Sequence, residues 1–130
     1  MNIAAQFLFD AKTFYLATNE GGQPRVRPFG AVAEFDGKTY IATNNKKKVF
    51  EQILKNPKVE ISAMYKGRWI RLAGELAVDS RQEAREAMIE TNPALKNMYK
   101  VDDGIFEVLY FTEGTASICS FNGETEEVTL

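Results

Sequence analysis

Apolar residues in the first third of the chain gather into short runs that are separated by glycine-containing breaks. The spacing of the first run is helical, whereas the next runs are rich in aromatic and β-branched residues, which favour strands. Gly21-Gly22 marks a turn, and Asp36-Gly37 is a two-residue hairpin signal. The pattern therefore predicts a helix over residues 2–11, a strand over 13–18, a long strand over 25–35 and a returning strand over 39–43.

The rest of the chain follows a scheme of hairpins interrupted by short helices. An apolar helical face follows the lysine run at 46–48 and ends at Asn56-Pro57, which predicts a short helix between them. Ser80-Arg81-Gln82-Glu83 has the form of a capping box and predicts a charged helix that runs to about Glu90. The other expected elements are strands over 59–65, 68–78, 105–112 and 115–121, turns at Lys66-Gly67 and Glu113-Gly114, a short helical piece that ends at Tyr99, and a tail that forms a last strand.

These elements predict a mainly β (α+β) domain. Hairpins outnumber crossovers, and six or seven strands with few helices favour an antiparallel barrel closed on itself, with short helices covering its gaps and ends. A doubly wound parallel sheet is disfavoured because it needs a helix after nearly every strand. The length of 130 residues suits a single domain, residues 1–130, around one core.

Composition and charge disfavour several classes of protein. The net charge of −2 and the pI of about 5.3 argue against general nucleic-acid binding, which needs a basic surface. No apolar run reaches the length of a membrane span, and the first ten residues lack the pattern of a signal peptide. The single cysteine, Cys119, allows no internal disulfide and fits a reducing compartment. We therefore expect a cytoplasmic protein that binds neither nucleic acid nor membrane.

Histidine is absent, which removes the commonest general base and the commonest metal ligand. With only one cysteine as well, the sequence disfavours a zinc site and any Ser-His or Cys-His catalysis. Redox chemistry would then have to come from a bound cofactor. The chain also lacks the glycine-rich motifs of dinucleotide-binding and P-loop proteins, so phosphate binding would rely on lysine, arginine and a helix end.

Two basic clusters point to an anion site. Arg25 and Arg27 alternate along a predicted strand, and the lysines at 46–48 open the helix that follows Thr43-Asn44. A helix N-terminus carries partial positive charge, so lysines there should weaken the helix. The unpaired amides of that end, with the lysines beside them, can instead bind an anion. The alternatives are a solvated lysine loop and an arginine face turned to water. On a mildly acidic protein, the clusters suit one small anion better than a polyanion.

Four segments, in order along nearly the whole chain, resemble one family. They are Phe14-Tyr15-Leu16-Ala17-Thr18, the Gly-x-Pro-x-x-Arg-Pro of residues 22–28, Tyr40-Ile41-Ala42-Thr43-Asn44 leading into Lys47-Lys48, and Arg68-Trp69-Ile70-Arg71-Leu72-Ala73-Gly74-Glu75. Together they resemble the pyridoxamine 5'-phosphate oxidase-like flavoproteins with the FMN-binding split-barrel fold.

The resemblance implies an antiparallel split β-barrel that binds FMN in a groove between the subunits of a homodimer. It places Arg27, Pro28 and Phe29 along the isoalloxazine edge, Thr43 and Asn44 near the ribityl-phosphate, Lys47 and Lys48 on the phosphate, Trp69 beside the flavin, and Phe111 as an aromatic from the partner subunit. For Trp69, packing in the core or at the dimer interface stays open as the alternative.

The chain departs from the vitamin-oxidising members of that family. Ser117 and Cys119 stand where those oxidases carry an Arg-x-His pair, so oxidation of the vitamin is not expected. Histidine-dependent nitroimidazole reduction and heme binding are disfavoured because the chain has no histidine. The resemblance therefore implies a flavoprotein that passes electrons from a nicotinamide nucleotide to a small acceptor. The alternative is a protein that binds or carries FMN, or a deazaflavin, without turnover.

Overall fold

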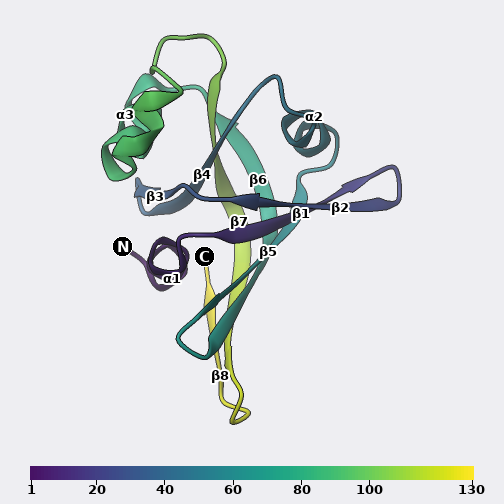
Figure 1. Cartoon of the computed structure of the whole chain (residues 1–130). Helices are drawn as coiled ribbons and strands as arrows, with labels where there is room; N and C mark the ends of the chain where they lie inside the picture. The colour runs from purple at the N-terminus through teal and green to yellow at the C-terminus, as the bar shows by residue number, and fades with distance from the viewer.

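The computed structural model describes all 130 residues. They form one eight-stranded antiparallel sheet, three α-helices and a short 3₁₀ helix (Figure 1). In chain order the elements are α1 (Ile3–Ala11), β1 (Phe14–Glu20), β2 (Gln23–Phe29), β3 (Val32–Phe35), β4 (Lys38–Asn44), α2 (Lys48–Lys55), β5 (Lys58–Tyr65), β6 (Arg68–Asp79), α3 (Gln82–Thr91), the 3₁₀ helix η1 (Pro93–Asn97), β7 (Phe106–Ser120) and β8 (Thr125–Thr129). The predicted split-barrel class is confirmed, with eight strands instead of six or seven.

The strands pair in the order β2-β1-β5-β6-β7-β4-β3, with β8 added to β7. Strand β7 serves two neighbours on the same edge: its first residues pair with β4 and its last residues pair with β8. Figure 1 shows β6 and β7 running side by side through the molecule, with α2 and α3 at one end and the β7–β8 hairpin at the other. This curved antiparallel sheet places the start of α2 and the end of α3 at the same end of the barrel.

Two facing glycines let β6 and β7 approach closely in the middle of their long pairing. Gly74 pairs with Gly114, next to a β-bulge between Glu75 and Leu76. A Cβ added at Gly74 would collide with the backbone carbonyl of Glu113 on the facing strand. Glycine is therefore needed here for close backbone approach, and the bulge increases the local twist of the sheet.

Two apolar clusters form the core. The larger one lies between α1, α2 and the inner face of the sheet and contains, among others, Phe14, Leu16 and Leu72. The smaller one lies beneath α3 and contains Met88 and Phe106. Because the inward residues alternate along the strands, both clusters follow from the apolar pattern of the sequence.

A buried carboxylate is satisfied beside the smaller cluster. The hydroxyl of Tyr40 donates a hydrogen bond to Asp79 Oδ2 at 2.7 Å, and Arg81 Nη2 donates to the same oxygen at 2.8 Å. The Arg81 guanidinium holds the pKa of Asp79 well below its usual range. Burial, together with the neighbouring carboxylate, raises the pKa of Tyr40.

The first helix and the two-residue turns that the sequence predicts are confirmed. The helix over residues 2–11 is present as α1, and both two-residue hairpins form. Asp36-Gly37 and Lys66-Gly67 have positive φ angles at both positions, as the tight turns between twisted strands require. Asn56-Pro57 ends α2 as predicted. None of the helices is both long and apolar enough to cross a bilayer.

Two strand predictions were wrong. The long strand expected over 25–35 is two strands, β2 and β3, because its first part pairs with β1 and its second part pairs with β4. Conversely, the strands expected over 105–112 and 115–121 are one strand, β7. Gly114 does not form a turn there, because it serves the close approach to Gly74.

The predicted capping box at residues 80–83 is also wrong. The N-cap of α3 is Arg81, whose side chain makes no capping hydrogen bond. Asp79 takes over part of this role, since its Oδ1 accepts a hydrogen bond from the backbone N–H of Arg81 at 3.0 Å. The short helical piece after Asn92-Pro93 is present as η1, a 3₁₀ helix that ends at Asn97.

Candidate functional site

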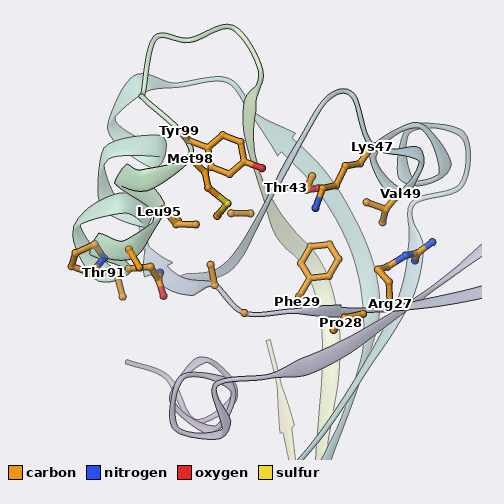
Figure 2. A pocket seen from close by; sticks show the side chains of 16 residues that line it. Arg27, Pro28, Phe29, Thr43, Lys47, Val49, Thr91, Leu95, Met98 and Tyr99 are labelled. Atoms are coloured by element: carbon orange, nitrogen blue, oxygen red, sulfur yellow. The ribbon is translucent and has the colours of Figure 1, made fainter.

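An apolar hollow of about 540 Å³ opens between the barrel and the α3–η1 segment (Figure 2). Its floor comes from the end of β2 and from β4, and its far wall comes from the end of α3 and from η1. This volume falls within the ordinary range of small-molecule sites. We call it the apolar hollow; its lining is Arg27, Pro28, Phe29, Gly30, Ala31, Ala42, Thr43, Lys47, Val49, Thr91, Asn92, Pro93, Ala94, Leu95, Met98 and Tyr99.

A second hollow of about 560 Å³, which we call the cationic hollow, adjoins the first between β2 and α2. It is lined by Glu20, Arg25, Val26, Arg27, Pro28, Lys47, Lys48, Val49 and Gln52. Four of these residues, Arg27, Pro28, Lys47 and Val49, also line the apolar hollow. The two hollows therefore meet, and together they offer an apolar surface at one side and four cations at the other.

The cationic side is built by the start of α2. Lys47 is the N-cap and makes no side-chain capping bond, and Lys48 is the first helical residue. The apolar face of α2 is buried through Val49 and Ile53, which turns both lysine side chains outward. The lysine run therefore lies beside a hollow, except for Lys46, which is exposed and lines neither one.

Thr43 carries the one buried polar side-chain atom that lacks a hydrogen-bond partner. Its side chain lies at the end of β4, is 5 % exposed and lines the apolar hollow. In Figure 2 the Lys47 side chain points toward it. A buried hydroxyl without a partner destabilises a protein, so Thr43 Oγ1 is an unsatisfied polar atom in the wall of the apolar hollow.

Arg27 lies at the boundary between the two hollows and is held from behind. Its Nη1 donates to the backbone oxygen of Leu16 at 3.2 Å and to Thr18 Oγ1 at 2.8 Å, and its Nη2 donates to Gln52 Oε1 at 2.6 Å. Burial lowers the pKa of Arg27, but an arginine remains charged at any physiological pH. The site therefore contains a fixed positive charge in a fixed orientation.

One carboxylate, Glu20, belongs to the cationic hollow. It accepts hydrogen bonds from Arg25 Nε at 3.1 Å and from Gln52 Nε2 at 3.2 Å. These bonds lower the pKa of Glu20, so it stays ionised near neutral pH. It neutralises part of the positive charge and is a poor proton donor.

Most of the predicted cofactor residues come together here. Arg27, Pro28, Phe29, Thr43 and Lys47 line the apolar hollow, and Lys48 lines the cationic one. Asn44 does not line either hollow, but its Nδ2 donates to the hydroxyl of Tyr99 at 2.8 Å, and Tyr99 lines the apolar hollow.

The two distant aromatic residues are not brought to the hollows of this chain. Trp69 lies on β6, half-buried, with its ring 4.9 Å from that of Phe121. Phe111 is 3 % exposed and belongs to the main core. A side chain so buried has almost no surface to offer to a ligand bound at a partner subunit, so its role here is packing.

Sequence reasoning missed the uncharged wall and one buried amide. Leu95, Met98 and Tyr99 close the apolar hollow from η1 and the loop after it, but apolar residues in a short helical piece resemble ordinary core residues. Gln52 did carry a signal: it falls on the buried face of α2 between Val49 and Ile53, where a polar residue needs a partner.

The arrangement is suited to binding rather than to acid–base chemistry. A ligand with a flat apolar part and an anionic end would match the apolar hollow with its uncharged wall and the cationic hollow with its lysines and arginines. The lining contains a single carboxylate, which is already ion-paired. Any chemistry at this site must therefore be supplied mainly by the bound molecule.

Comparison with known proteins identifies the family of the chain. The family model of pyridoxamine 5'-phosphate oxidase matches residues 3–117. A crystal structure of a NimC/NimA family protein from Clostridium acetobutylicum is 61 % identical and superposes with a TM-score of 0.96, covering 100 % of this chain and 92 % of that one.

More distant structures share the fold. A pyridoxamine 5'-phosphate oxidase-related, FMN-binding protein from Nostoc punctiforme is 16 % identical, with a TM-score of 0.61 over 97 % of this chain and 91 % of that one. A heme-binding protein from Mycobacterium smegmatis is 17 % identical, with a TM-score of 0.77 over 97 % of this chain and 57 % of that one. No curated protein matches the chain. On the family match and the 61 % identical structure, the chain belongs to the pyridoxamine 5'-phosphate oxidase family.

Proposed function

We propose that this protein is a cytoplasmic FMN-binding oxidoreductase. The observation that carries the proposal is the junction of the apolar and cationic hollows at Arg27, Pro28, Lys47 and Val49. FMN has the matching form, a flat ring system with a phosphate monoester at the end of a flexible chain. The fold relative from Nostoc punctiforme, itself described as FMN-binding, supports the choice of ligand.

The residues present fit FMN in three respects. Lys47 and Lys48 supply two ammonium groups beside a helix start that lacks a side-chain cap, which suits a phosphate of about −1.5 to −2 charges. Thr43, which lines the apolar hollow together with Lys47, carries an unpaired hydroxyl that would suit the polyhydroxyl chain of the ligand. Pro28, Phe29 and the wall from η1 offer the uncharged surfaces that a ring system requires.

A bound flavin would supply the redox chemistry, accepting electrons from a nicotinamide nucleotide and passing them to a small acceptor. The protein's own contribution is then binding, orientation and charge. Arg27 keeps a positive charge at the junction of the hollows, which would favour the negative charge of a phosphate bound beside Lys47 and Lys48. The uncharged wall with Leu95 and Met98 would keep water away and favour an uncharged, flat acceptor.

We also propose that the active form is a homodimer with the cofactor at the subunit interface. The outer face of β1, β5 and β6 carries exposed apolar side chains at adjoining positions. Tyr15 faces Ser62 across β1 and β5, Met64 follows two residues later on the same face, and Met64 pairs with Trp69. Met64 is 62 % exposed, and Phe121, which packs on Trp69, is 74 % exposed. A second copy would cover this face.

The test is spectroscopic. Purified protein that is saturated with FMN should show a bound-flavin absorption spectrum, and anaerobic addition of NADH or NADPH should bleach it within seconds to minutes. No uptake of FMN at micromolar concentration would overturn the proposed cofactor. Tight uptake with bleaching no faster than that of free FMN would show a binding or carrier protein instead of an oxidoreductase.

A further inference from the structure

We propose that Gln52 and Thr18 orient Arg27 so that the free edge of its guanidinium donates hydrogen bonds to the terminal phosphate of the ligand. The inference rests on the proposed function and deepens it. It assigns Gln52, which lines the cationic hollow, and Thr18 behind it as positioning residues that act through Arg27, and their effect is read from the preference for a phosphate monoester over an uncharged end.

The argument begins with the donors of Arg27. A guanidinium has five N–H groups, two on each Nη and one on Nε. Both Nη1 donors have partners, in the backbone oxygen of Leu16 and in Thr18 Oγ1, and one Nη2 donor is bound to Gln52 Oε1. The donors left without a protein partner are Nε–H and the second Nη2–H. These two point the same way from one edge of the group, and such an edge can bind two oxygens of one phosphate.

The free edge belongs to a residue that lines the cationic hollow. Lys47 and Lys48 line the same hollow, so a phosphate held by the ammonium groups would lie among all three cations. Lysine acts as a point charge with freely rotating donors, whereas arginine adds a fixed planar geometry. The lysines would therefore attract any anion, and the arginine fork would add preference for a group with two oxygens on one face.

The orientation of Arg27 is set by a chain of directed hydrogen bonds. Gln52 is 5 % exposed and Thr18 is 4 % exposed, so neither can exchange its partners for water. Thr18 Oγ1 donates to Gln52 Oε1 at 2.6 Å while it accepts from Arg27 Nη1. Gln52 Nε2 donates to Glu20 at 3.2 Å.

Glu20 fixes the direction of this chain. Its carboxylate can only accept hydrogen bonds near neutral pH, so the Nε2 end of Gln52 must face it. The Oε1 end must then face Arg27 and Thr18. Arg25 Nε lies 3.1 Å from Glu20 Oε1, and this ion pair ends the series of hydrogen bonds at the protein surface. The amide of Gln52 thus has one orientation, and with it the Arg27 fork.

Two substitutions test this assignment. Gln52→Met keeps the length and burial of the side chain but removes the acceptor that holds Nη2. Arg27→Lys keeps a positive charge at this position of β2 but removes the planar guanidinium that can bind two oxygens at once. Gln6→Met is the matched control, because Gln6 lies on the exposed face of α1, where its amide bonds only to Asp10. Affinities for FMN and for riboflavin, which lacks the phosphate, are measured for each variant by fluorescence titration of the full-length protein.

We expect Gln52→Met and Arg27→Lys each to weaken FMN binding roughly 10- to 100-fold, while riboflavin binding changes no more than about 2-fold. The rise in FMN affinity as the phosphate loses its second proton, near pH 6, should also be smaller in both variants. Gln6→Met should behave like wild type. If FMN and riboflavin lose affinity by the same factor, Gln52 is only structural and the proposal is overturned.

The outcomes separate this inference from the proposed function. Failure of the wild-type protein to bind FMN would contradict both the proposed function and the inference about Arg27. If wild type clearly prefers FMN to riboflavin and Arg27→Lys keeps the same preference, the contact between Arg27 and the phosphate is contradicted while the proposed function stands. That second outcome decides the question even if Gln52→Met does not fold.

Discussion

Replacing Thr43 by valine should make the ligand-free protein more stable and its ligand complex weaker. The hydroxyl of Thr43 is buried at the end of β4 without a hydrogen-bond partner, beside the apolar hollow. Valine has nearly the same shape but puts a methyl group where the hydroxyl was. The substitution therefore removes the unsatisfied atom and keeps the packing.

The size of the effect follows from the burial of the atom. Leaving a buried hydroxyl unbonded costs about 1–3 kcal/mol, so Thr43→Val should raise the free energy of unfolding by about 1–2 kcal/mol. For a chain of this length, each kcal/mol corresponds to about 3–5 °C in Tm. If the hydroxyl bonds to the ligand, FMN affinity should fall by about 0.5–1.5 kcal/mol, or roughly 2- to 10-fold.

Thermal unfolding with and without FMN, together with FMN titration, measures both effects. Thr39→Val is the matched control, because Thr39 lies on the same strand, is also buried and has a satisfied hydroxyl that accepts from Asn2 Nδ2 at 3.0 Å. That control should lose stability, by about 1 kcal/mol. If ligand-free Thr43→Val is destabilised to the same extent as Thr39→Val, then Thr43 is satisfied in solution and the reasoning fails.

Three further predictions address the phosphate, the sheet and the buried carboxylate. Lys48→Ala should weaken FMN binding by about 1–3 kcal/mol, more at low salt, whereas Lys46→Ala should change it little; equal losses in titration would refute the assignment. Gly74→Ala should lower the free energy of unfolding by about 2–4 kcal/mol in denaturant titration, because its Cβ would meet the backbone of β7, whereas Gly30→Ala, with space for a Cβ, should cost less than about 1 kcal/mol. The lowered pKa of Asp79 means that its carboxylate stabilises the fold above the unfolded-state pKa, near 4, and that this contribution is lost as the pH falls toward the folded value. Asp79→Asn should therefore cost about 2–4 kcal/mol at pH 7 and flatten the decline of stability below pH 5; an unchanged pH profile would contradict the role of this carboxylate.

Local turn chemistry made most of the fold predictable. Asp36-Gly37 predicted its hairpin because aspartate and glycine are among the few residue types that readily adopt positive φ, and in Lys66-Gly67 the glycine alone carries that signal. The errors arose where a residue serves a contact distant in sequence. The local sequence predicts a turn at Gly114, although this glycine allows close packing against Gly74, and no local pattern distinguishes these two uses of glycine.

The site was predictable where charge and position in the chain coincide. Arg27, Lys47 and Lys48 stood out because cations at a strand–helix junction are unusual, and all three line the hollows. The wall with Leu95 and Met98 could not be predicted, since its approach to β2 depends on how α3 packs against the sheet. A hydrogen-bonding role for Gln52 could have been predicted, because a glutamine on the buried face of a helix needs a hydrogen-bond partner.

The central claim is that the joined hollows hold FMN with its phosphate among the cations. The most direct measurement is a crystal structure of the protein with bound FMN. The account predicts phosphate oxygens within hydrogen-bonding distance of Lys47, Lys48 and the Nε–Nη2 edge of Arg27, with the ring system against Pro28 and Phe29. A flavin bound elsewhere, or a phosphate that extends into solvent away from these three side chains, would contradict it.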